Sequence, residues 1–150
     1  MQSEDVLQGF LSKDADRVLV ASNEVRKSII TNRGMIEALS PYIDEIEAAT
    51  CNLSYGGAIM PNWRFVHKAL MIIRDSRIKA CLCEYAFEDY GQSVKMLENY
   101  GFKILFEWVE REKFTTFGEI ECPLCHQRYI AEEEFTGWHM TTSRHRKVEK

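Results

Sequence analysis

Proline, repeats and long apolar runs are all scarce in this sequence. Only 3 of its 150 residues are proline, and no internal repeat, low-complexity stretch or Pro/Gly-rich linker interrupts residues 1–110. No run approaches the roughly 18 apolar residues that a membrane-spanning helix needs. The first residues lack the basic start and apolar stretch of a secretory signal. With 45% hydrophobic and 28% charged residues, we expect a folded globular protein in the nucleus or cytoplasm, without a membrane partner.

A strong positive charge is also missing. The formal net charge is −4; residues 122–150 hold five Lys or Arg and four acids, a net of +1, which leaves −5 for the remainder. Proteins dominated by phosphate contacts are usually strongly basic, because they neutralise phosphates and release counterions. The composition therefore excludes that class of nucleic-acid binder.

Catalytic groupings are not apparent. His67 is the only histidine outside the C-terminal region, and Glu88-Asp89 has no paired acid. Gly56-Gly57 is not followed by the Lys-Ser or Lys-Thr of a phosphate-binding loop. We expect a non-catalytic protein.

The C-terminal region instead contains a metal-ligand pattern. Cys122-Pro-Leu-Cys125 is followed after thirteen residues by His139, and after five more by His145. Zinc takes four tetrahedral nitrogen and sulfur ligands, and a two-residue gap lets a tight turn aim both thiolates at one ion. We predict Zn²⁺ bound by these two cysteines and two histidines, with metal-dependent folding of the segment.

This arrangement resembles the matrin-type zinc finger, a branch of the two-cysteine two-histidine fingers. The resemblance lies in Cys-x2-Cys, the long spacer, His-x5-His and the ending Thr142-Ser-Arg-His-Arg-Lys147. The resemblance implies a ββα finger that binds zinc, and a place among RNA-processing and double-stranded-RNA-binding proteins. Relatives of this finger also serve as protein-docking modules. The spacer is one residue longer than usual, and Gly137 lies within it.

Within that finger, we expect a hairpin carrying the cysteines and a helix carrying the histidines. Its small core would comprise Tyr129, Phe135 and Trp138, with His126 exposed. The acids at 132–134 would occupy the first turn of the helix, where they favour its dipole. Because that end of the helix reads bases in DNA-binding fingers, sequence-specific DNA reading is not expected. The basic end supplies the candidate contacts Arg144, Arg146 and Lys147.

Three further cysteines, Cys51, Cys81 and Cys83, have no secretory context and should be reduced. The apolar run 78–87 indicates a buried strand. On a strand, one intervening residue places Cys81 and Cys83 on opposite faces, so we interpret both as structural.

The rest of the N-terminal portion indicates a helix-rich mixed domain. Helices are expected at 3–11, at 40–49 after Ser40-Pro41, at 62–75 and at 88–100, with a loop at 51–61. Residues 14–39 fit either one helix broken near Gly34 or a strand at 17–21 followed by a helix. Residues 102–109 fit a strand better than a helix, giving a strand-helix-strand unit over 78–109. The predicted fold class is α+β, with domains at 1–115 and 116–150 and an all-α N-terminal domain as the alternative.

A basic stretch in the helix at 62–75 bears on partners. Arg64 and Lys68 lie one turn apart near Trp63, a combination able to hold an RNA backbone and stack a base. The alternative is a solvated helix face. Two functions fit the sequence: association with RNA or the RNA-processing machinery, and a zinc-stabilised adaptor between proteins.

Overall fold

The structure, a computed structural model, describes residues 1–87, 93–137 and 140–149. It divides into two compact units, Met1–Leu82 and Cys83–Lys150, whereas the sequence placed the division after residue 115. Each unit has its own buried core.

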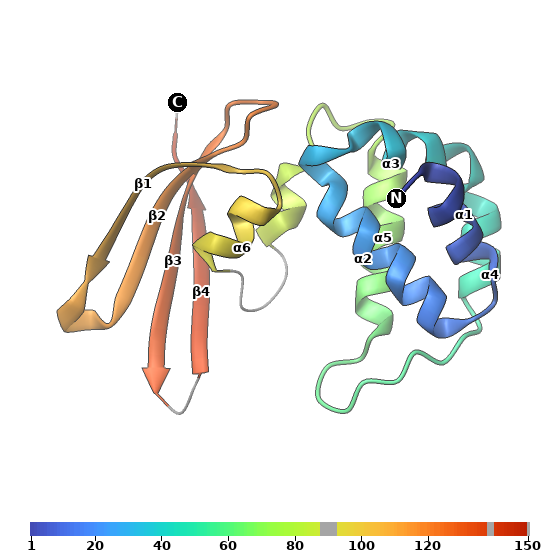
Figure 1. Ribbon diagram of the computed structural model, residues 1–150, viewed down its shortest axis with the longest axis horizontal. Coiled ribbons are helices and arrows are strands. Elements are labelled where there is room, and N and C mark those ends of the chain that lie inside the picture. The colour runs from blue at the N-terminus through green and yellow to red at the C-terminus, as the bar shows by residue number, and fades with distance from the viewer. Residues whose placement is uncertain (88–92, 138–139, 150) are drawn as a thin grey trace. The chain divides into compact units, whose positions relative to one another are not determined.

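Unit 1 is helical (Figure 1). Its elements are α1 (Ser3–Leu11), α2 (Ala15–Thr31), α3 (Arg33–Leu39), the 3₁₀ helix η1 (Ser40–Tyr42), α4 (Ile43–Thr50) and α5 (Trp63–Asp75). The apolar stripe of each helix is buried, and the fully buried side chains include Phe10, Val25, Ile29, Ile36, Ile46, Ile72 and Ile73. The helices expected at 3–11, 40–49 and 62–75 are confirmed, as is the loop between α4 and α5.

The long segment 14–39 is helical, and the strand considered for 17–21 is wrong. Asp14 begins α2, since its carboxylate accepts the backbone N–H groups of Asp16 and Arg17. The break falls at Asn32, two residues before the expected Gly34. There the Asn32 side chain accepts the Met35 N–H at 3.3 Å and caps α3.

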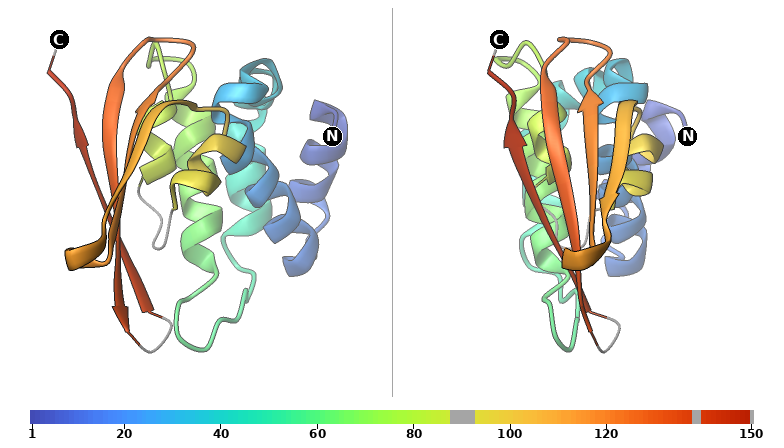
Figure 2. Two further views of the ribbon diagram at one scale, coloured as in Figure 1. Left: turned by 60° about the vertical axis from the view of Figure 1, so that its left-hand side comes forward. Right: turned by 90° about the vertical axis from the view of Figure 1, so that its left-hand side faces the viewer.

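Unit 2 contains the sheet. It comprises the 3₁₀ helix η2 (Cys83–Phe87), α6 (Val94–Asn99), β1 (Lys103–Glu110), the 3₁₀ helix η3 (Arg111–Lys113), β2 (Thr115–Glu121), β3 (Arg128–Gly137) and β4 (Met140–Lys147). The four strands pair antiparallel in the order β1-β2-β3-β4, as Figures 1 and 2 show. The α+β class is therefore confirmed, with helices first and strands at the C-terminal end.

One local prediction near the start of unit 2 needs correction. The expected strand at 78–87 is wrong, because Cys83–Phe87 forms η2. Its buried residues are Cys83, Tyr85 and Ala86, and Cys83 and Ala86 lie three positions apart, which is the period of a 3₁₀ helix. The strand preferred for 102–109 is confirmed as β1. Of the helix expected at 88–100, Val94–Asn99 is α6, and residues 88–92 lie outside the described part.

The helix predicted for the ββα finger is also wrong: the residues that the structure describes in this region form strands. Residues 140–147 form β4, and the acids at 132–134 lie in β3. Tyr129 and Ala131 are buried with one intervening residue, so β3 follows the period of a strand. That alternation outweighs the preference of the acids for a helix start.

One face of the sheet packs on α6. Gly118 of β2 allows this approach, since a Cβ at that position would lie 2.8 Å from Val94 Cγ2. Ile120, Tyr129 and Ala131 are buried on the same face. The opposite face of the sheet carries a different set of side chains.

Candidate metal centre

The Cys122–Cys125 pair lies in the turn between β2 and β3. The Cys122 N–H donates to the Gln127 carbonyl at 3.0 Å, and the His126 N–H donates back to the Cys122 carbonyl at 2.9 Å. His126 adopts a positive φ of 59°, which reverses the chain after Cys125. The turn therefore holds both thiols on one side, as the two-residue spacing predicted.

A second pair, Cys81 and Cys83, follows α5. The segment leading to it is fixed by Arg33, whose guanidinium donates to the carbonyls of Ser76 at 3.3 Å, Lys79 at 2.6 Å and Ala80. Cys83 then begins η2. Because this stretch is not a strand, the two thiols do not point to opposite faces, and our interpretation of them as purely structural is corrected.

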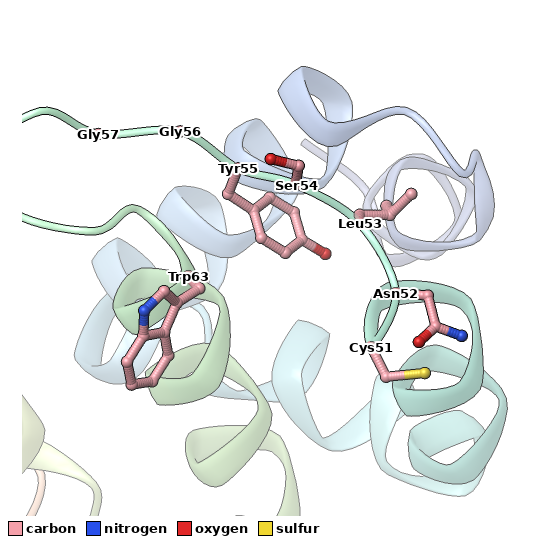
Figure 3. Close-up of a pocket in the computed structure, with 8 residues that line it drawn as sticks. All are labelled: Cys51, Asn52, Leu53, Ser54, Tyr55, Gly56, Gly57 and Trp63. Atoms are coloured by element: carbon pink, nitrogen blue, oxygen red, sulfur yellow. The ribbon is translucent and has the colours of Figure 1, made fainter.

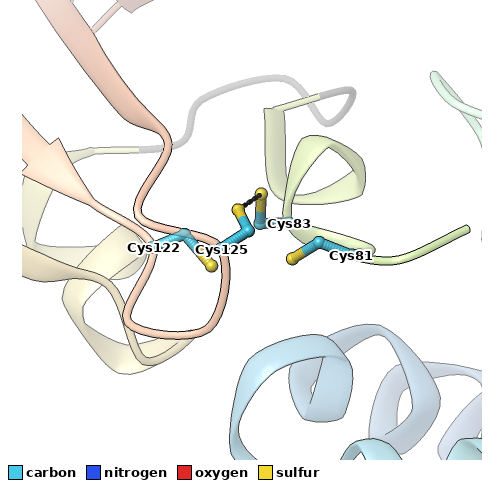
Figure 4. A group of neighbouring side chains, drawn as sticks. All are labelled: Cys81, Cys83, Cys122 and Cys125. Carbon is cyan, nitrogen blue, oxygen red and sulfur yellow. Dashed lines mark hydrogen bonds between the residues drawn. The ribbon is translucent and has the colours of Figure 1, made fainter. Parts of the chain in front are cut away.

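The four sulfur atoms form one group. All four Sγ atoms lie within 4.8 Å of one another, and Figure 4 shows the side chains converging. Cys83 Sγ and Cys125 Sγ are 3.6 Å apart. A tetrahedral zinc with Zn–S bonds of about 2.3 Å requires sulfur atoms roughly 3.8 Å apart, so adjustments of an ångström or less would complete the shell. The four cysteines can thus hold a metal ion, with zinc a plausible occupant.

The surroundings suit thiolate ligands. Cys83 and Cys122 are buried, and the Tyr129 hydroxyl lies 3.2 Å from Cys83 Sγ. Burial, then the contact with Cys83, raises the pKa of Tyr129, so its hydroxyl keeps the proton it can donate. The Tyr129 ring packs on Phe87 at 4.5 Å and Phe102 at 6.0 Å.

Lys147 brings a positive charge close to the sulfurs. Its ammonium pairs with Glu84, beside Cys83. The hydrogen bond to Glu84 raises the pKa of Lys147, and the charges of Cys83 and Cys125 contribute in the same direction. A cation near a four-thiolate centre offsets part of its negative charge.

The predicted histidine ligands are placed differently. His145 lies opposite Ala131 in the β3–β4 register and stacks on Phe87 at 4.4 Å. It is among the described residues, but it does not belong to the four-sulfur group. His139 and Trp138 lie outside the described residues. The matrin-type ligand set stays a prediction.

Other residues of the expected finger are partly as predicted. Tyr129 is buried, whereas Phe135 is half exposed and not part of a core. His126 is exposed, as expected, with Nδ1 3.4 Å from Glu121. Hydrogen bonds from Arg128, then His126, lower the pKa of the Glu121 carboxyl.

The predicted contact residues are scattered. Arg144 and Arg146 are exposed on β4, while Lys147 is engaged by Glu84. In unit 1, Trp63 and Arg64 are exposed, but Lys68 is buried. Three further cations, at the end of α5 and just after it, are held locally: Arg74 pairs with Glu47, Arg77 donates to the Ser40 carbonyl, and Lys79 pairs with Asp75.

A pocket lies beside Trp63 (Figure 3). It has a volume of about 560 Å³ and is lined by Trp63 and residues 51–57. Tyr55 closes one side, its hydroxyl donating to the Thr50 carbonyl at 2.7 Å. Asn62 anchors the loop by donating from Nδ2 to the Tyr55 carbonyl at 2.9 Å.

Comparisons with known proteins return no match from protein-family models, curated proteins or solved structures. Among the described residues, no helix is both long and apolar enough to cross a membrane. The assignment of the metal centre accordingly rests on the geometry of the four cysteines alone.

The sequence contained one signal for the missed ligands. Cys81 and Cys83 are separated by one residue and lie far from Cys122-x2-Cys125, as a second half of a four-cysteine site would. This signal was overlooked because His139 and His145, downstream of Cys122 and Cys125, completed a set of four ligands without Cys81 and Cys83.

Proposed function

We propose that this chain is a zinc-stabilised, non-catalytic binding protein whose ion is held by Cys81, Cys83, Cys122 and Cys125. The convergence of the four Sγ atoms within 4.8 Å supports the proposal. Four protein thiolates fill a tetrahedral zinc shell and leave no position for water or substrate, which is the pattern of structural rather than catalytic zinc.

Metal content of purified variants tests the ligand set. The four-cysteine site predicts one zinc per chain in the wild type and in His139→Ala and His145→Ala, but loss of zinc in Cys81→Ser. Cys51→Ser is the matched control, because Cys51 is an exposed cysteine outside the group. Zinc retained in Cys81→Ser and lost in His139→Ala would restore the matrin-type set.

We further propose that the ligand is RNA and that an unpaired base occupies the pocket beside Trp63. Support comes from the pocket's composition: an aromatic side chain that is 53% exposed, with Tyr55 opposite and the polar groups of Asn52 and Ser54 on the lining. Single-stranded RNA is commonly recognised by stacking of splayed bases on aromatic rings. Arg64, the next residue along α5, adds a positive charge next to the pocket.

Fluorescence anisotropy with a labelled single-stranded RNA, at low and physiological salt, tests this proposal. Trp63→Ala should weaken binding about 5- to 150-fold, because stacking contributes about 1–3 kcal/mol per base. Trp63→Phe should retain most affinity, and Tyr42→Ala, an exposed aromatic elsewhere in unit 1, should retain all of it. Absence of binding, or binding unaffected by Trp63→Ala, would favour the alternative, a zinc-stabilised adaptor between proteins.

A further inference from the structure

The face of the sheet opposite α6 has an ordered pattern. Residues paired directly across antiparallel strands lie on the same face, so the registers define rows. One row runs Trp108, Phe117, Glu132, Arg144 from β1 to β4; the adjacent row runs Phe106, Glu119, Ile130, Arg146. The right panel of Figure 2 looks onto this face. Both rows therefore begin with an aromatic side chain on β1 and end with an arginine on β4.

The aromatic side of this outer face is a continuous patch. Trp108 and Phe117 are stacked with ring centroids 5.1 Å apart, and Phe106 lies 5.6 Å from Trp108. Phe106 is 61% exposed. Exposed aromatic patches of this kind mark interaction surfaces in soluble proteins.

The arginine side is available for an external contact. Arg144 and Arg146 are exposed, and within the described part of the chain neither forms an ion pair. The rest of the face is not basic: its carboxylates outnumber its cations, Glu110, Glu119, Glu121, Glu132 and Glu134 against Lys103, Arg128, Arg144 and Arg146. A polyanion would be repelled by these carboxylates. The mixed charge of the face therefore favours a partner that carries both acidic and basic groups.

We propose that this outer face binds the same face of a second copy of the chain. A two-fold axis parallel to the strands, between β2 and β3, places β1 of one copy over β4 of the other. Phe106 then faces Arg146 of the second copy, and Trp108 faces Arg144. An arginine over an aromatic ring is a favourable cation–π pair, and the symmetry makes each pair twice.

One further pair of positions agrees with this arrangement, whereas the same axis places Glu119 opposite Ile130 and Glu132 opposite Phe117. Across the same axis, Glu121 of β2 faces Arg128 of β3 in the second copy, bringing opposite charges together. Two sheets related in this way pack with their strands aligned, one of the two common modes of sheet packing. A patch four strands wide and about seven residues long measures roughly 19 by 23 Å. Covering it on both copies buries on the order of 1,000 Å², the lower end for specific interfaces.

A complementation experiment tests the pairing with the full chain loaded with zinc. Sedimentation velocity measures the oligomeric state of the wild type, of Arg146→Glu and of Phe106→Lys. The wild type should be dimeric at about 100 µM, a concentration at which a micromolar complex is mostly formed. Each variant alone should lose at least tenfold in dimer affinity, since one places a carboxylate against a ring and the other a lysine against an arginine. Mixed 1:1, the two variants should form a heterodimer. One of its two contacts is then the native pair of Phe106 with Arg146, and the other is a new ion pair between the introduced lysine and the introduced glutamate.

Val109→Lys is the matched control. Val109 is 59% exposed on the same strand but points to the other face, because it alternates with Trp108. It should dimerise as the wild type does. A monomeric wild type, variants that dimerise normally, or a mixture that stays monomeric each overturns the proposal. Zinc content is measured on every sample, so failure here is distinguishable from failure of the metal site.

Discussion

At the residue scale, Arg33 fixes the segment that leads from α5 to Cys81. Its guanidinium donates to the backbone carbonyls of Ser76, Lys79 and Ala80, in the stretch that immediately precedes Cys81. A side chain that orients a ligand segment is equivalent to the outer-shell partners of metal sites, whose loss typically costs 10- to 100-fold in metal affinity. Arg33 is therefore a positioning residue for Cys81.

Arg33→Gln should lower zinc affinity about tenfold, because the shorter amide cannot reach all three carbonyls. Competition with a chromophoric chelator gives the affinity. Glu37→Gln is the control: Glu37 pairs with Arg33 on the exposed side and touches none of the carbonyls. Equal zinc affinity in the Arg33 variant and the wild type would show that the segment holds itself in place.

His126 offers a second residue-scale prediction. Its φ of 59° is costly for a residue with a Cβ, by about 1 kcal/mol. His126→Gly should therefore be more stable than His126→Ala by roughly that amount, although both lose the imidazole. Thermal unfolding of the zinc-loaded variants measures the difference, and both should keep their zinc. Loss of zinc from both would identify His126 as a ligand.

At the scale of elements, the contact between α6 and the sheet depends on the absence of a side chain at Gly118. A Cβ there would lie 2.8 and 2.9 Å from the two Val94 methyls. Gly118→Ala should destabilise unit 2 by about 1–3 kcal/mol, the usual effect of overpacking. In Gly118→Ala/Val94→Ala the clash is removed, so the double variant should be more stable than the sum of the single effects. Chemical denaturation of all four proteins gives the coupling; additive effects would contradict the contact.

The same scale shows how far the sequence determines this fold. Helices with an apolar stripe and a capping residue, such as α2 after Asp14, were predictable because local signals and tertiary packing agree. At Cys83–Phe87 a short apolar run fitted several periods, and only packing selects the 3₁₀ helix. For β4, the long-range pairing with β3 decides against a helix. The Cys122–Cys125 half of the centre was predictable from spacing, whereas Cys81 and Cys83 join it through contacts distant in sequence.

At the scale of the whole molecule, the two units should respond differently to loss of metal. Unit 1 buries apolar side chains of its own, including Phe10, Ile29, Ile36 and Ile72, and its one residue in the four-cysteine group, Cys81, lies after its last helix. In unit 2, the β2–β3 turn and the start of η2 both carry metal ligands. Where ligands organise the surrounding chain, metal binding free energy contributes directly to folding free energy.

Chelation of zinc should therefore unfold the surroundings of Cys122–Cys125 and leave most helical structure of unit 1 intact. Hydrogen exchange followed by mass spectrometry resolves the two: peptides covering β2 and β3 should lose protection, while peptides covering α2 and α5 should keep theirs. Cys122→Ser should reproduce the effect without chelator, and Cys51→Ser should not. Protection lost throughout α2 and α5 as well would mean that the helices fold only with the metal present, so that the two units share one folding transition.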